Sequence, residues 1–61
     1  MSAYLIRAGA GVWLADMTED GPVWTAQLPN ATLIYDFNDA VRLAKSLGDV
    51  PFGPLAVEPA L

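Results

Sequence analysis

The chain has 61 residues, of which 54% are hydrophobic and 16% are charged, and its formal net charge is -4. It contains no cysteine and no histidine, which excludes disulfide frameworks, thiol nucleophiles and imidazole acid–base chemistry. The acidic balance argues against a nucleic-acid partner, because phosphate binding requires clustered lysine and arginine. We therefore expect one small domain over 1–61 that is not an enzyme and uses no cofactor or metal.

Three strands are predicted in the first half of the chain. The first two, 4–8 and 12–17, flank the glycine-containing turn 9–11. The polar turn 18–21 leads into the third strand, 23–28, which Pro29 ends. Strands joined by such short turns are expected to pair antiparallel.

A helix over 37–47 follows a short β-branched and aromatic stretch, 32–35, that predicts a fourth strand. Asp36 is a suitable N-cap, and Gly48 is the expected end of the helix. Apolar residues recur at the spacing of one helical face: Phe37, Ala40, Val41, Ala44 and Leu47.

The last segment of the chain is rich in proline. Pro51, Pro54 and Pro59 leave room for a short edge strand over 55–57. The predicted fold class is therefore α+β, a small antiparallel sheet of three to four strands with one helix packed on one face.

The turn lengths also predict which residues lie opposite one another. The expected pairs are Ile6 with Leu14, Arg7 with Trp13, Trp13 with Ala26, Ala15 with Trp24, and Met17 with Pro22. One face then carries Leu5, Arg7, Trp13, Ala15, Met17, Trp24, Ala26 and Leu28. The other carries Tyr4, Ile6, Ala8, Val12, Leu14, Val23 and Thr25.

Both predicted faces are largely apolar, whereas a sheet with one wet face alternates between apolar and polar residues. One helix covers one face, so the second face is expected to meet another protein. The interface candidates are Arg7, Trp13, Met17, Trp24 and Leu28, since tryptophan and arginine are enriched in protein interfaces. Arg7 beside Trp13 is equally consistent with an exposed strand residue that stacks on the indole.

Several residues carry a loose resemblance to short phage and prophage proteins that run strand–strand–helix–strand. They are Trp24 and Thr25, then Ala31 and Tyr35, then Ala40 and Ala44 of the helix. The resemblance covers roughly 4–58, although this chain is more apolar and less charged than is usual for that group. It implies the fold and a phage setting, and some small phage proteins bind host factors.

A calcium-binding hairpin is an alternative. Asp16, Thr18, Asp20 and Gly21 match the start of an EF-hand loop, but its twelfth position is Gln27 instead of a bidentate glutamate. A polar hairpin turn accounts for the same residues without an ion.

No targeting or membrane segment is expected, because Arg7 breaks the first apolar stretch and no long apolar run follows. We expect a cytoplasmic protein-interaction module of phage or prophage type. Its expected partners are a second copy, as a homodimer or larger oligomer, and a host protein. The first alternative is a purely self-associating structural subunit, ahead of the calcium-binding hairpin.

Overall fold

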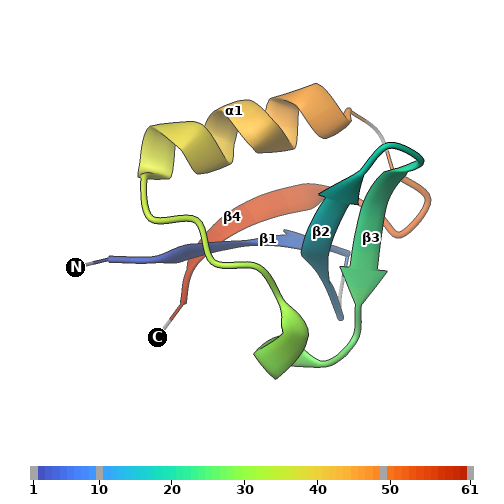
Figure 1. Ribbon diagram of the computed structural model, residues 1–61, viewed down its shortest axis with the longest axis horizontal. Helices are drawn as coiled ribbons and strands as arrows, with labels where there is room; N and C mark the ends of the chain where they lie inside the picture. Colours follow the sequence, from blue (N-terminus) through green and yellow to red (C-terminus); the bar gives the residue numbers. More distant parts are fainter. Residues whose placement is uncertain (1, 10, 49, 61) are drawn as a thin grey trace.

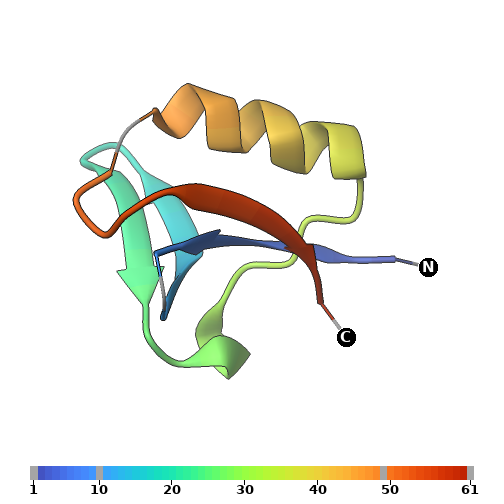
Figure 2. The same cartoon turned by 180° about the vertical axis from the view of Figure 1, so that it is seen from behind.

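The computed structural model describes residues 2–9, 11–48 and 50–60. Its elements are β1 (Tyr4–Ala8), β2 (Val12–Thr18), β3 (Gly21–Thr25), the 3-10 turn η1 (Leu28–Asn30), α1 (Phe37–Leu47) and β4 (Leu55–Pro59). The strands form one antiparallel sheet in the order β3-β2-β1-β4, and α1 lies across one side of it (Figures 1 and 2). The predicted α+β class is thereby confirmed.

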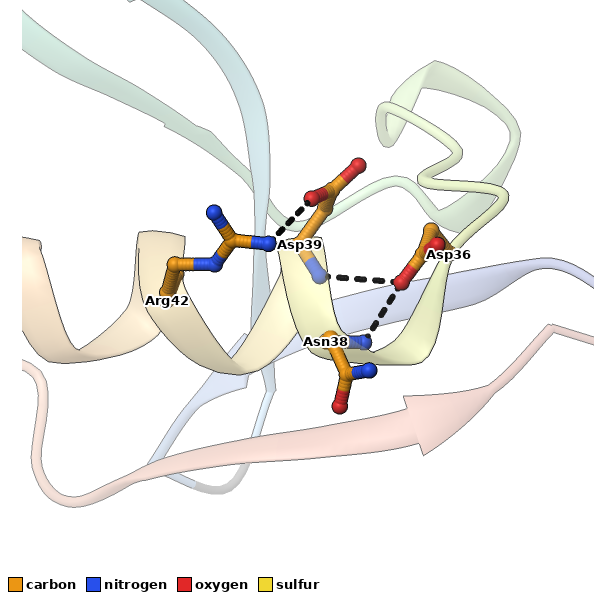
Figure 3. A network of polar contacts seen from close by, with 4 residues as sticks. All are labelled: Asp36, Asn38, Asp39 and Arg42. Carbon is orange, nitrogen blue, oxygen red and sulfur yellow. Dashed lines mark hydrogen bonds and ion pairs between the residues drawn. The ribbon is translucent and has the colours of Figure 1, made fainter.

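Helix α1 has the predicted bounds, and its ends show why. An Asp36 carboxylate oxygen accepts hydrogen bonds from the backbone N–H groups of Asn38 (2.8 Å) and Asp39 (3.2 Å), two donors that the helix leaves free (Figure 3). Arg42 pairs with Asp39 one turn further on, at 3.1 Å. Gly48 ends the helix with a φ of 66°, in the left-handed region that favours glycine.

The two hairpins keep the predicted register close to their turns. Arg7 lies opposite Trp13 next to the first turn, and Met17 lies opposite Pro22 next to the second. Ala10, in the first turn, lies outside the described residues.

At the end away from the first turn, β1 and β2 are no longer paired with each other. The segment 32–34, which precedes α1, lies between them. The N–H of Thr32 donates to the carbonyl oxygen of Leu14 (2.9 Å), and Tyr4 exchanges two backbone hydrogen bonds with Ile34. The expected pairing of Ile6 with Leu14 is therefore wrong, because Leu14 pairs with the inserted segment. The fourth strand predicted there is reduced to the single bridge at Ile34.

A β-bulge in β2 changes the register of the second hairpin. Trp24 lies opposite Leu14 instead of Ala15, and Trp13 lies opposite Thr25, one position from the expected pair. The extra residue on β2 is Ala15, which has no partner on β3. Because a one-residue slip inverts the faces, Trp24 moves to the side of the sheet opposite Trp13.

The hydrophobic core lies between the sheet and α1. The buried residues are Leu5, Ile6, Ala8, Leu14 and Ala40. Helix α1 packs against both β1 and β4, and the edge-to-face pair of Tyr4 and Phe37 closes its first turn onto β1. The side of the sheet that carries Ile6 and Leu14 is therefore the covered one, and Leu5 is buried on the opposite side.

The two outer strands differ from their predicted lengths. Strand β3 ends at Thr25, three residues before the predicted end at Leu28. Leu28 begins the turn η1, and Pro29 follows it there. Strand β4 continues to Pro59, two residues beyond the predicted end, and pairs along its whole length with β1. It forms one edge of the sheet.

Candidate functional site

The structure does not bring the five predicted interface residues onto one surface. Arg7 and Trp13 stay together on the sheet side away from α1, which we call the open face. Met17 and Trp24 lie on the other side, since Met17 pairs with Pro22 two residues before Trp24. Leu28, predicted in the third strand, lies outside the sheet in η1. The prediction of a single tryptophan face is wrong, and the bulge is the cause.

A polar cluster on the open face joins three strands. The indole N–H of Trp13 donates a hydrogen bond to Glu58 Oε1 at 3.0 Å. Arg7 Nε lies 3.3 Å from Glu58 Oε2, and the two side chains are 39% and 33% exposed. Arg7 Nε is shielded from solvent and has no partner in hydrogen-bond geometry, so its contact with Glu58 is an ion pair only.

Glu58 is not among the predicted interface residues. It lies opposite Leu5 in the β1–β4 ladder and so faces the same side as Arg7 and Trp13. Glu58 was missed because the predicted edge strand ends at residue 57, which leaves Glu58 outside the sheet. In the structure β4 continues to Pro59 and includes it.

An apolar depression of about 220 Å³ lies on the open face. Its lining residues come from β1, η1, the segment before α1 and the end of the chain: Leu5, Leu28, Leu33 and Ala60. Leu28 is 50% exposed and Leu33 is 46% exposed, while Leu5 beneath them is buried. The depression therefore has exposed leucine side chains at its rim and a buried leucine at its floor.

Trp24 has a partner within the chain. Its ring meets that of Phe52 edge to face, with centroids 5.9 Å apart. Phe52 belongs to the segment between α1 and β4, so this contact holds that segment against β3. We assign Trp24 a packing role.

The larger groove, of about 660 Å³, runs between α1 and β4. It is lined by Val41, Ala44, Lys45, Gly48, Val50, Gly53, Pro54, Leu55 and Val57. Lys45 is the one ionisable side chain in this set, so the described lining offers no acid–base pair and no activated nucleophile. The groove is open to solvent.

The polar turn predicted as a calcium alternative uses its side chains for its own geometry. The hydroxyl of Thr18 donates to the carbonyl oxygen of Gly21 (2.9 Å) and accepts from the N–H of Asp20 (3.2 Å). Asp16 likewise accepts from the N–H of Met17 (2.8 Å). Within the described ranges, no group of three or more acidic side chains is placed to hold a metal ion.

No helix in the described part of the chain is long and apolar enough to cross a membrane. The chain matches no family model, and the searches of curated proteins and of solved structures gave no significant match.

Proposed function

We propose that the protein is a small, cytoplasmic, non-enzymatic interaction module that docks a partner protein on its open face. The observation that carries the proposal is the apolar depression flanked by the Trp13–Glu58–Arg7 cluster. An apolar centre beside tryptophan and arginine is the composition of protein-binding surfaces.

The arrangement of the open face supports this reading. Helix α1 lies on the other side of the sheet and does not cover the open face (Figures 1 and 2). The Trp13–Glu58 hydrogen bond and the buried Leu5 fix the surface around the two exposed leucines. A partner would therefore meet a pre-organised surface, which lowers the entropic cost of docking.

The proposed partner is a protein that inserts an apolar side chain between Leu28 and Leu33. The resemblance to small phage and prophage proteins adds a host protein as the proposed source of that partner. A self-associating structural subunit is the second candidate, because the same depression would then hold a residue of another copy.

Quantitative affinity capture from host lysate tests the proposal. The double variant Leu28→Ser, Leu33→Ser should lower recovery of the partner by about tenfold or more, equivalent to about 1.4 kcal/mol. Met17→Ser is the matched control, because Met17 is 45% exposed but lies on the other side of the sheet. Equal recovery with wild type and the double variant, both folded by circular dichroism, would contradict the proposal.

A further inference from the structure

The outer edge of β4 has backbone groups that the sheet does not use. Gly9 N–H donates to the Pro54 carbonyl (3.0 Å), and Ala60 N–H donates to the Ala3 carbonyl (2.9 Å). In an antiparallel ladder the bonding direction alternates, so the even-numbered residues of β4 bond to β1. The N–H and C=O groups of Leu55 and Val57 therefore point away from the sheet, and β1 is the one strand beside β4 in the described chain.

The two N–H and two C=O groups of Leu55 and Val57 can pair with the same four groups of a second copy. We propose that the β4 edge binds the β4 edge of a second copy, antiparallel, about a two-fold axis beside Ala56. Leu55 of each copy then lies opposite Val57 of the other and exchanges both backbone hydrogen bonds with it. The resulting four bonds use every outward N–H and C=O of the two residues.

The ends of β4 exclude neighbouring registers. Pro59 has no N–H to donate, so a shift that sets Leu55 opposite Pro59 would leave the Leu55 carbonyl without a partner. A shift the other way requires an extended Gly53, which has a φ of 121°. The register centred on Ala56 is the one that satisfies the edge completely.

The position of α1 suits the same two-fold axis. Because α1 packs equally against β1 and β4, we infer that its axis lies midway between them, about half a strand spacing inside β4. Pairing at the β4 edge then separates the two helices by about two strand spacings, about 10 Å. This is the distance at which helices pack, so each α1 would close the groove of the other copy over Val41 and Ala44.

The charges on the meeting surfaces favour a second copy. The two-fold axis makes the helices antiparallel, so the opposite partial charges of the two helix dipoles lie side by side. On the open face the axis passes between two alanines at position 56, so no like charges lie directly opposite. Glu58 is already paired with Arg7 of its own chain.

Such a dimer extends the sheet to eight strands and sets the two open faces side by side. It is independent of the docking surface proposed above, since it uses the sheet edge and the α1 side. Its variants should therefore change self-association and leave the docking residues in place.

A single cysteine provides the most specific test, because the natural chain has none. In the proposed register the two residues at 56 form a non-hydrogen-bonded pair with Cα atoms about 4.5 Å apart, within reach of a disulfide. Ala56→Cys should give a covalent dimer at least about tenfold faster than Thr25→Cys, which places a thiol on the strand at the opposite edge. Equal rates, or faster crosslinking of Thr25→Cys, would overturn the proposal.

Sedimentation equilibrium supplies an independent readout. The wild-type protein should be dimeric at about 100 µM and dissociate on dilution, as mass action requires. A synthetic chain with an N-methyl group on Val57 loses an outward donor and should be monomeric while keeping its circular dichroism spectrum. Pro59→Ala, which changes the same edge beyond the paired residues, should remain dimeric. A wild-type monomer at this concentration, or a dimer that survives N-methylation, would overturn the proposal.

Discussion

Trp13 and Glu58 are 45 residues apart in the chain, and the indole N–H of Trp13 donates to a carboxylate oxygen of Glu58 at 3.0 Å. The bond spans β1, because Trp13 belongs to β2 and Glu58 to β4, the strands on either side of it. The last strand of the chain is thereby tied to the first hairpin. This link also fixes the polar border of the open face.

Removing the Glu58 side chain should lower the free energy of unfolding. Glu58→Ala is expected to cost about 1–2 kcal/mol, because it removes a hydrogen bond to a charged acceptor and a partly exposed ion pair. Glu58→Gln keeps an oxygen for Trp13 and should cost less than about 1 kcal/mol. Urea unfolding measures both, and equal losses would show that the Trp13 hydrogen bond contributes nothing.

Glycine is required at position 9, where β1 turns into the first loop. Its φ is 59°, and a Cβ atom there would overlap the backbone carbonyl of Phe52. Gly9→Ala should therefore destabilise the fold by more than about 2 kcal/mol. Gly11→Ala is the control, because a Cβ there meets nothing and should change stability by less than about 0.5 kcal/mol. Similar melting temperatures for the two variants would contradict this packing.

The Asp36 cap should account for more helix stability than the exposed ion pair beyond it. Asp36→Ala is expected to cost about 1 kcal/mol, whereas Asp36→Asn keeps the acceptor oxygen and should cost a few tenths. Arg42→Ala removes a pair that is 77% and 61% exposed and should cost less than about 0.5 kcal/mol. Thermal unfolding followed by circular dichroism ranks the three, and a larger loss for Arg42→Ala would reverse the assignment.

Truncation of Leu14, in the core, should lower the free energy of unfolding more than truncation of Leu33, on the open face. Leu14 is completely buried, so Leu14→Ala should cost about 2–5 kcal/mol and populate the unfolded state of a domain this small. Leu33 is 46% exposed, and Leu33→Ala should cost about 1 kcal/mol or less. Chemical denaturation of both variants checks the difference. A stability loss at Leu33 as large as that at Leu14 would mean that the depression is core and not a docking surface.

The parts of the fold set by local chemistry could be predicted from the sequence. The bounds of α1 follow from the Asp36 cap, the apolar spacing and Gly48, and each acts within a few residues. The pairs next to the turns, Arg7–Trp13 and Met17–Pro22, follow from turn length. These features need no knowledge of distant contacts.

The bulge at Ala15 could not be predicted in this way. Ala15 and its neighbours Leu14 and Asp16 include no glycine or proline, the residues that often mark a bulge. The turn length alone predicts an uninterrupted ladder. The one local trace is Asp16, a poor strand residue, whose carboxylate accepts from the N–H of Met17. One unpaired residue was enough to separate Trp13 from Trp24, so the predicted site was lost with the register.

The docking surface proposed here depends on contacts between distant segments. Leu28 was predicted on a strand and lies instead in η1, where it meets Leu5, Leu33 and Ala60 from other parts of the chain. Glu58 joined the cluster because β4 pairs two residues further than its prolines indicated. Local sequence patterns carry little information about such tertiary contacts.

Photo-crosslinking in cells tests the central claim, that the open face docks another protein, most directly. A benzophenone side chain at position 33 should form covalent adducts with a different protein, and the same group at position 17, on the other side of the sheet, should not. Leu33 and Met17 have nearly equal exposure, 46% and 45%, so accessibility alone would give equal yields. Adducts at position 17 with none at position 33, or adducts at position 33 with the protein's own copies alone, would contradict the account.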